Sequence, residues 1–202
     1  MASSLSCVGV LWAFLSLTAA ILCCTGFYVP FWIQGRLMDK VDAYFGSFRR
    51  CNYPRVTSGG VVEIVQECGR YSNFKDIPSV WWQVTTILAG AGSAITLIVA
   101  VTAISACCVS YVIHPATAKL AGAMQFIAAA LVLVGVAIYP MGWDNREVRE
   151  SCGNLSNVYK LGTCQLSWSL YLLSAAVIIL LLCFSLSFCA ARVVPPEGSF
   201  RI

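Results

Sequence analysis

The chain has 202 residues, of which 59% are hydrophobic and 11% are charged, with a formal net charge of +4. Soluble domains carry about a quarter charged residues. This composition, with a mean hydropathy of +0.79, therefore indicates a membrane protein and excludes an ordinary soluble domain. The basic residues are spread through the polar segments and form no Lys/Arg run, which argues against a nucleic-acid partner.

Four long runs of the sequence contain no charged residue: 2–35, 77–118, 120–143 and 161–191. Each run exceeds the roughly 20 residues that cross a hydrocarbon core about 30 Å thick, where helices satisfy their own backbone hydrogen bonds. We expect a single tetraspan domain. Its transmembrane helices should lie at about 6–31, 80–113, 119–141 and 165–191, its large loops at about 32–79 and 142–164, and its C-terminal tail at 192–202.

The first apolar run is also compatible with a cleaved signal peptide. No Lys or Arg precedes it, and it is far longer than the usual apolar core of about 7 to 15 residues, so we expect a retained helix. Small residues at Gly9, Ala13, Ser16 and Ala20 form a stripe along this helix. Such a stripe allows a neighbouring helix to approach closely, and we expect it to pack inside the bundle.

The segment 34–79 is the largest hydrophilic stretch and has strand-like content. Residues 61–65 are rich in β-branched side chains, residues 44–48 are aromatic and roughly alternating, and residues 57–60 supply turn-forming Thr, Ser and Gly. This pattern predicts a small antiparallel sheet that rests on the helices.

The segment 139–164 is a short polar loop between two apolar runs. It carries the glycosylation sequon Asn154-Leu155-Ser156, and its acidic residues alternate with Arg146 and Arg149. We expect ion pairs that fix this loop, and Asn154 is a candidate glycosylation site.

Eleven cysteines are present, and four of them lie in the two large loops: Cys51, Cys68, Cys152 and Cys164. Four cysteines allow three pairings. We favour Cys51 with Cys68 and Cys152 with Cys164, because each bridge closes a short local loop. An even number in each loop, together with the sequon, predicts an extracellular or lumenal face for both loops.

The positive-inside rule disagrees with this orientation. The two large loops hold ten of the thirteen Lys and Arg residues, which would place them in the cytoplasm. We give more weight to the cysteines and the sequon, because acidic residues neutralise much of that charge locally. Tryptophans also gather at the large-loop ends of the helices, where we expect an interfacial belt: Trp32, Trp81, Trp82, Trp143 and Trp168.

Catalytic and metal-binding patterns are missing from the sequence. The one histidine, His114, has no second ligand at metal-site spacing, and no nucleophile has a base nearby. We therefore expect no enzymatic activity, no cofactor and no small-molecule substrate. Gln125 is the most polar side chain well inside a predicted helix, and we expect it to form an interhelical hydrogen bond.

The end of the molecule opposite the large loops offers two kinds of interaction motif. Cys107, Cys108 and Cys189 lie at helix ends, where palmitoylation and simple apolar packing are both reasonable. The terminal Phe200-Arg201-Ile202 has the apolar-x-apolar form that can add a strand to a PDZ domain.

Several motifs extend over nearly the whole chain up to about Arg192: Leu11-Trp12-Ala13-Phe14-Leu15-Ser16, Phe48-Arg49-Arg50-Cys51-Asn52-Tyr53-Pro54, Glu67-Cys68-Gly69-Arg70-Tyr71, Ile77-Pro78-Ser79, Tyr139-Pro140-Met141-Gly142-Trp143-Asp144, Glu147-Val148-Arg149, Cys152-Gly153, Leu161-Gly162-Thr163-Cys164 and Trp168. In this order, the motifs resemble the lipoma fusion-partner-like (LHFP-like) tetraspan family, within the claudin-like superfamily.

The resemblance implies a claudin-like fold, mainly α-helical: a left-handed bundle of four transmembrane helices, a small extracellular antiparallel β-sheet and cytoplasmic termini. Phe48 stands where claudins carry tryptophan, and Cys68 lies further from Cys51 than the second claudin cysteine does. These departures count against a true claudin function. Characterised relatives act as auxiliary subunits of ion-channel or receptor complexes.

We therefore expect a non-enzymatic auxiliary or assembly subunit at the plasma membrane, with membrane lipid and another integral membrane protein as partners. The alternative is a claudin-like adhesion or paracellular barrier protein. We expect exposed residues of the first large loop to contact the partner: Arg49, Arg50, Arg70 and Tyr71.

Overall fold

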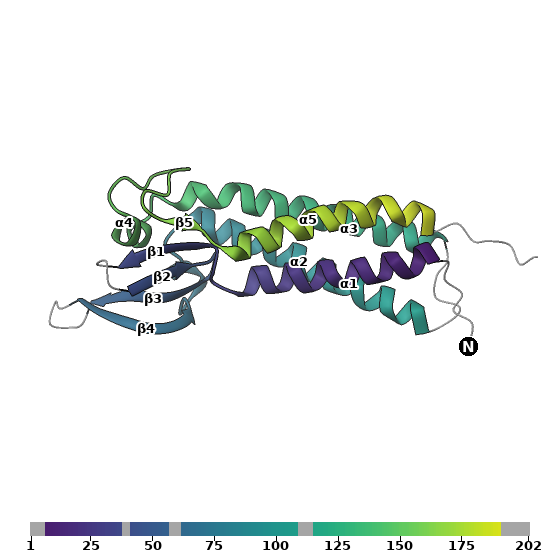
Figure 1. Cartoon of the computed structure of the whole chain (residues 1–202), viewed down its shortest axis with the longest axis horizontal. Helices are drawn as coiled ribbons and strands as arrows, with labels where there is room; N and C mark the ends of the chain where they lie inside the picture. The colour runs from purple at the N-terminus through teal and green to yellow at the C-terminus, as the bar shows by residue number, and fades with distance from the viewer. Residues whose placement is uncertain (1–6, 38–40, 57–61, 109–114, 191–202) are drawn as a thin grey trace, which may run out of the picture.

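The computed structural model describes residues 7–37, 41–56, 62–108 and 115–190. Four long helices run side by side: α1 (Cys7–Tyr28), α2 (Val80–Cys108), α3 (Pro115–Ile138) and α5 (Trp168–Ala190). Each is long and apolar enough to cross a membrane. Each packs on two neighbours, in the order α1, α2, α3, α5 around the bundle. Helix α1 begins and α5 ends at the same end of the bundle, away from the sheet (Figure 1).

A five-stranded antiparallel sheet lies at the other end of the bundle (Figure 1). Its strands are β1 (Ile33–Leu37), β2 (Val41–Phe45), β3 (Arg49–Val56), β4 (Val62–Arg70) and β5 (Gln165–Leu166). They lie in the order β4-β3-β2-β1-β5. The structure thus confirms the predicted fold class, a four-helix membrane bundle with a small antiparallel sheet. We call the described parts of 29–79 and 139–167 the head.

The sheet contains strands beyond the two strand-like segments, 44–48 and 61–65, noted in the sequence. The aromatic stretch expected to be one strand is divided, because β2 ends at Phe45 and residues 46–48 connect it to β3. Strand β5 has only two residues and pairs with the start of β1, too short for a periodic pattern to reveal. The head also contains helix α4 (Arg146–Cys152) and the single turns η1 (Phe74–Asp76) and η2 (Tyr139–Gly142), none of which was predicted.

Small residues bring the helices close together. All four members of the α1 stripe are buried, as predicted. Gly92 of α2 faces α3 so closely that a Cβ atom on it would lie 2.6 Å from Val132 Cγ2. Apolar side chains gain little by leaving lipid, so such backbone proximity is the main attraction between helices.

Gln125 joins α3 to α1, which confirms its predicted hydrogen bond. Its side chain is 1% exposed. Its Oε1 accepts from Trp12 Nε1 at 3.1 Å, and its Nε2 donates to Ser16 Oγ at 2.7 Å. The Ser16 hydroxyl in turn donates to the Trp12 carbonyl. Both polar atoms of the Gln125 side chain, Oε1 and Nε2, therefore have a hydrogen-bond partner inside the bundle.

An aromatic cluster joins the head to the bundle. Trp82 stacks on Tyr139, and Trp32 packs edge-on against the same ring. The Tyr139 hydroxyl donates to the Phe45 carbonyl at 3.0 Å. The expected interfacial belt is therefore wrong for three of its five tryptophans: Trp32, Trp82 and Trp143 are buried, and only Trp81 and Trp168 are exposed. These three rings fill the space between helix ends and sheet, where they bury more apolar area than at a lipid surface.

Some predicted features lie outside the described residues. They are His114, the turn at 57–60, the C-terminal Phe200-Arg201-Ile202, and the side chains of Cys107 and Cys108.

Candidate interaction surface on the head

Two disulfides brace the head, and both are the predicted pairs. Cys51 of β3 lies directly opposite Cys68 of β4 in the strand register, with a Cα–Cα distance of 4.0 Å. Cys152, the last residue of α4, is bridged to Cys164, just before β5, with a Cα–Cα distance of 5.0 Å. The first bridge joins strands that are already hydrogen-bonded. The second joins the end of α4 to a loop that is not paired with it as a strand, although Thr163 N donates to the Cys152 carbonyl at 3.0 Å.

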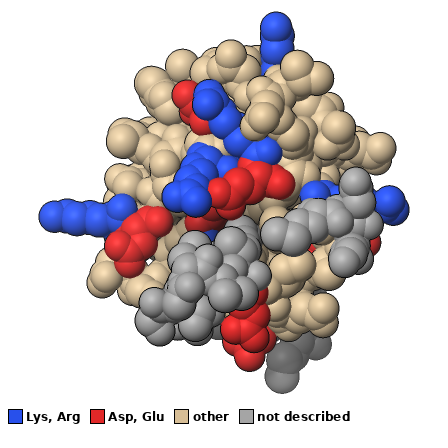
Figure 2. All heavy atoms as spheres, turned by 90° about the vertical axis from the view of Figure 1, so that its left-hand side faces the viewer, with Lys and Arg blue, Asp and Glu red and all other residues tan. Residues whose placement is uncertain are grey.

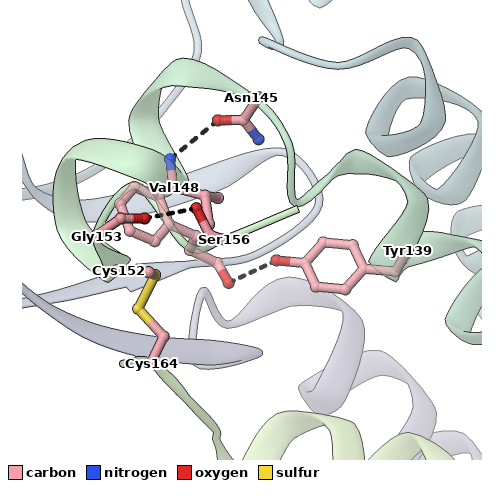
Figure 3. Close-up of a disulfide and its surroundings, with 8 residues drawn as sticks. Tyr139, Asn145, Val148, Cys152, Gly153, Ser156 and Cys164 are labelled. Atoms are coloured by element: carbon pink, nitrogen blue, oxygen red, sulfur yellow. Dashed lines mark hydrogen bonds between the residues drawn. A yellow bond between two sulfur atoms is a disulfide. The ribbon is translucent and has the colours of Figure 1, made fainter. Parts of the chain in front are cut away.

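Helix α4 sits against β1 and positions the second bridge (Figure 3). Asn145 is the N-cap: its side-chain oxygen accepts from Val148 N at 3.0 Å. Such a cap satisfies a backbone donor that the helix itself cannot. The Cys152–Cys164 bridge packs over Gly35 of β1, where a Cβ atom would lie 2.4 Å from Cys164 Sγ. Only glycine leaves room for the bridge at this position.

A charged contact ties the two large loops together. Arg50 of β3 forms an ion pair with Glu147 of α4, and the Tyr71 hydroxyl donates to the other Glu147 oxygen at 2.7 Å. The Arg50 guanidinium also lies 3.9 Å from the Tyr53 ring centroid and 4.6 Å from that of Tyr71. The sequence predicted that Glu147 would pair within its own loop. Among the described residues, Arg146 and Glu150 form the only ion pair within this loop.

Burial dominates the electrostatics of this contact. It raises the pKa of Glu147 above its ordinary value, and Arg50 and the Tyr71 hydrogen bond lower it only in part. Burial and the nearby carboxylate also raise the pKa of Tyr71. Tyr71 therefore keeps its proton and can act as a donor, as the contact requires.

The predicted partner-contact residues differ in their exposure. Arg70 is exposed, and Arg49 and Arg50 are half-buried. Tyr71 is only 7% exposed, so the expectation that it lies at the surface is wrong, because its ring packs under Arg50 and its hydroxyl binds Glu147. Figure 2 views the head end-on and shows basic and acidic side chains intermixed across this face.

Sequence reasoning missed an apolar surface on the second loop. Leu155 is 82% exposed, and Val158 and Tyr159 beside it are also exposed. The Tyr159 hydroxyl donates to the Ala137 carbonyl of α3 at 2.8 Å, so this loop lies along the end of α3. We call residues 154–159 the second-loop tip. The only feature of the sequence that could have indicated this surface is the presence of apolar side chains on an otherwise polar loop.

The modification candidates lie at opposite ends of the molecule. Asn154 is exposed at the second-loop tip, as a glycan requires. Ser156 of the same sequon is buried and donates to the Gly153 carbonyl. Cys189 is a free, exposed thiol near the end of α5. Glycosylation and palmitoylation at these positions remain predictions.

The described residues form no metal centre. No group of three or more His, Cys, Asp or Glu side chains in that part of the chain is arranged to hold a metal ion. The clustered ionisable groups of the head, Arg50, Glu147 and Tyr71, bind one another. This arrangement fixes the position of α4 relative to β3.

Comparison with known proteins agrees with this architecture. The family model described as "Lipoma HMGIC fusion partner-like protein" matches residues 8–192. The LHFPL tetraspan subfamily member 3 protein of Xenopus laevis is 33% identical over 188 residues, covering 91% of this chain and 79% of the relative. The LHFPL tetraspan subfamily member 2a protein of Danio rerio is 29% identical over 189 residues, covering 88% and 84%. The human member 2 protein is 26% identical over 196 residues, with the same coverage. The chain is therefore a multi-pass membrane protein that belongs to the lipoma HMGIC fusion partner-like (LHFPL) tetraspan family.

Proposed function

We propose that this protein is a non-enzymatic auxiliary or assembly subunit of an ion-channel or receptor complex. In this proposal it resides in the plasma membrane, with the head outside the cell and both termini in the cytoplasm. Its helices dock on the partner's membrane segments, and its head contacts the partner's extracellular part.

The observation that carries the proposal is a rigid head with an exposed apolar surface. The disulfides, the aromatic cluster and the Arg50–Glu147 pair hold the head in one shape, while Leu155 stands 82% exposed at the second-loop tip. Exposed apolar groups rimmed by polar residues mark protein or membrane contacts. A preformed surface also loses less conformational entropy on binding.

The bundle itself supports a subunit rather than a transporter. Lys119 is the one charged residue in the described parts of the four long helices, and it is exposed near the start of α3. Ion and proton paths normally require ionisable groups inside the spans.

Disulfides and a sequon support the proposed orientation. Both cysteine pairs lie in the head, as does the exposed Asn154. Disulfides persist in oxidising compartments, and glycans are added in the lumen of the secretory route.

Crosslinking in native membranes tests the proposal. The full chain carries an affinity tag at its C-terminus, and crosslinked partners are identified by mass spectrometry. We expect enrichment of one channel or receptor. We expect Leu155→Ala to reduce that enrichment severalfold, whereas Phe74→Ala, which shortens another exposed apolar side chain of the head, should leave it unchanged.

Recovery of the chain only with itself and with junctional components would contradict the subunit proposal. Expression in non-adherent cells would then examine the adhesion alternative, which requires new cell contacts or a changed paracellular resistance.

A further inference from the structure

An apolar groove opens on the membrane-facing side of the bundle, between α1 and α2 at the head end. It has a volume of about 470 Å³, and its lining includes Cys24, Phe27, Tyr28, Gly90, Ala94 and Leu97. This volume lies within the range of about 300 to 1,000 Å³ that is typical of ligand sites.

The groove exists because the facing residues are small. A Cβ atom on Gly90 would lie 3.1 Å from Phe27 Cζ, so the Phe27 ring rests directly on the α2 backbone. Ala94, further along α2, is exposed and adds little bulk. Tyr28 and Leu97 are 60% and 51% exposed, which leaves the groove open to the surrounding lipid.

One arginine of the head lies at the end of this groove, and a second lies next to it in the sheet. The Arg49 guanidinium carbon is 4.3 Å from the centroid of the Tyr28 ring, one wall of the groove. Arg49 of β3 is directly opposite Arg70 of β4 in the strand register, so both side chains lie on one face of the sheet. Like charges in directly opposite positions repel each other and require compensation.

No acidic side chain among the described residues compensates these two arginines. The Arg49 Nε is buried and has no hydrogen-bond partner in that part of the structure. The next residue differs: Arg50 is neutralised by Glu147. The fold therefore supplies an acid for Arg50 and leaves Arg49 and Arg70 to an anion from outside the chain.

The position of these arginines matches the depth of lipid headgroups. Helix α1 ends at Tyr28, and Phe48, which precedes Arg49, packs against Phe27 of α1 with ring centroids 4.9 Å apart. The Arg49 guanidinium therefore lies where the apolar helix surface gives way to the polar head, and Arg70 is its neighbour on β4. Guanidinium groups bind phosphate oxygens through paired, charge-assisted hydrogen bonds.

We propose that this groove is a phospholipid site, in which one acyl chain lies between α1 and α2 and the lipid phosphate binds Arg49 and Arg70. The lipid belongs to the leaflet at the head end. It covers the apolar groove and neutralises the two arginines, and it thereby completes the junction between α1 and the sheet.

Native mass spectrometry of the purified full chain tests the site with two probes. Phosphatidylglycerol carries the phosphate, and a diacylglycerol with the same acyl chains lacks it. We expect the wild type to retain one phosphatidylglycerol and at least fivefold less diacylglycerol. We expect Arg49→Gln and Arg70→Gln each to lower phosphatidylglycerol retention severalfold, and Ala94→Phe to lower it at least tenfold by filling the groove.

Matched controls separate the site from general lipid contact. Ala123→Phe enlarges an exposed alanine of α3, and Arg149→Gln removes an exposed charge of α4; both should retain lipid as the wild type does. Thermal unfolding in the same detergent confirms that each variant is folded. Equal retention by Ala94→Phe and Ala123→Phe, or equal retention of the two probes by the wild type, would overturn the proposal.

Photolabelling keeps the proposal testable even if lipid is lost during purification. In nanodiscs, a phosphatidylglycerol with a diazirine on its acyl chain should label the peptide containing Leu97 more strongly than the peptide containing Leu133, an exposed residue of α3. Equal labelling of the two peptides would also overturn the proposal.

Discussion

The head and the helix bundle are held together by different kinds of interaction. The head relies on a few concentrated contacts: the two disulfides and an aromatic cluster around Tyr139. The Arg50–Glu147 ion pair sets the position of α4 over the sheet. The bundle relies on many small-residue contacts and on the buried Gln125 network.

The two environments account for this difference. In water, a unit as small as the head cannot bury enough apolar area for stability and needs covalent support. In lipid, apolar side chains gain nothing by mutual burial, so close backbone packing and an occasional hydrogen bond hold the helices. Substitutions at key positions of the head should therefore have larger effects than substitutions of comparable size in the bundle.

The largest expected effect is the loss of the buried disulfide. We expect Cys152→Ala with Cys164→Ala to destabilise the protein by about 2 to 5 kcal/mol and to abolish surface delivery. Both cysteines are buried. Helix α4 is joined to the segment before β5 by this bridge and by the hydrogen bond from Thr163 N to the Cys152 carbonyl, without strand pairing. Surface biotinylation and thermal unfolding of the purified chain measure the two effects.

The matched control is Cys51→Ala with Cys68→Ala. The chain-entropy model favours this bridge by about 0.3 kcal/mol, because its sequence separation is 17 rather than 12 residues. We nevertheless expect the control to lose less stability, since strand pairing holds β3 to β4 without the bridge and Cys68 is exposed. A greater loss in the control would mean that loop closure outweighs burial in the head.

A single methyl group at Gly35 gives the next largest effect. In Gly35→Ala the new Cβ would meet Cys164 Sγ and the Ser151 carbonyl, and overpacking of this kind costs about 1 to 3 kcal/mol. Gly69→Ala is the control, because nothing lies within 4 Å of its Cβ position. Equal midpoints of thermal unfolding for the two variants would show that the bridge can move away from β1.

The bundle should respond more weakly to the loss of its polar network. Gln125→Leu leaves the indole donor of Trp12 without its acceptor. Hydrogen bonds between membrane helices contribute about 0.6 kcal/mol on average, so we expect a loss of about 1 kcal/mol or less.

A double-mutant cycle with Trp12→Phe isolates the Gln125 contact. A coupling energy near zero in thermal unfolding would mean that the Trp12–Gln125 bond adds nothing to bundle stability. A value above about 2 kcal/mol would contradict the weaker response expected of the bundle.

The sequence predicted those features that depend on composition and local spacing. The four spans follow from runs without charge, and both disulfides follow from two cysteines in each loop. Gln125 was found because an amide inside an apolar helix needs a partner. Each of these inferences concerns residues that can be accommodated in a membrane protein in only a few ways.

Features that depend on contacts distant in sequence were not predictable. Trp32, Trp82 and Trp143 occupy positions that suit an interfacial belt, and only the placement of the sheet over the helix ends buries them. Glu147 has arginines beside it in sequence, yet its partner is Arg50, 97 residues away. Tyr71 is buried for the same reason, since its partners come from β3 and α4.

The smallest expected effect concerns Glu147. Here a substitution in the head should change stability less than the Gln125 substitution in the bundle does. Burial raises the pKa of this carboxyl in the folded state, so the folded protein binds a proton more readily than the unfolded chain does. Wild-type stability relative to Glu147→Gln should therefore increase as the pH falls from neutral through the raised pKa towards about 4.3, the ordinary glutamate value. At neutral pH we expect the two proteins to differ little. Glu147→Gln removes the cost of burying the carboxylate, and Arg50 does not become a fully buried unpaired charge, because it is 22% exposed and lies over the Tyr53 and Tyr71 rings.

Thermal unfolding of both proteins across pH 4 to 8 measures this difference. Arg146→Gln serves as the control, because it removes an exposed pair of the same helix, and exposed pairs contribute little. A wild type that loses stability against Glu147→Gln as the pH falls would show that Arg50 outweighs burial. In that case the ion pair would belong with the disulfides among the contacts that stabilise the head. If the wild type instead gains stability as the pH falls, as we expect, the ion pair mainly fixes the position of α4 over the sheet. The stability of the head then comes from the Cys152–Cys164 bridge and the aromatic cluster.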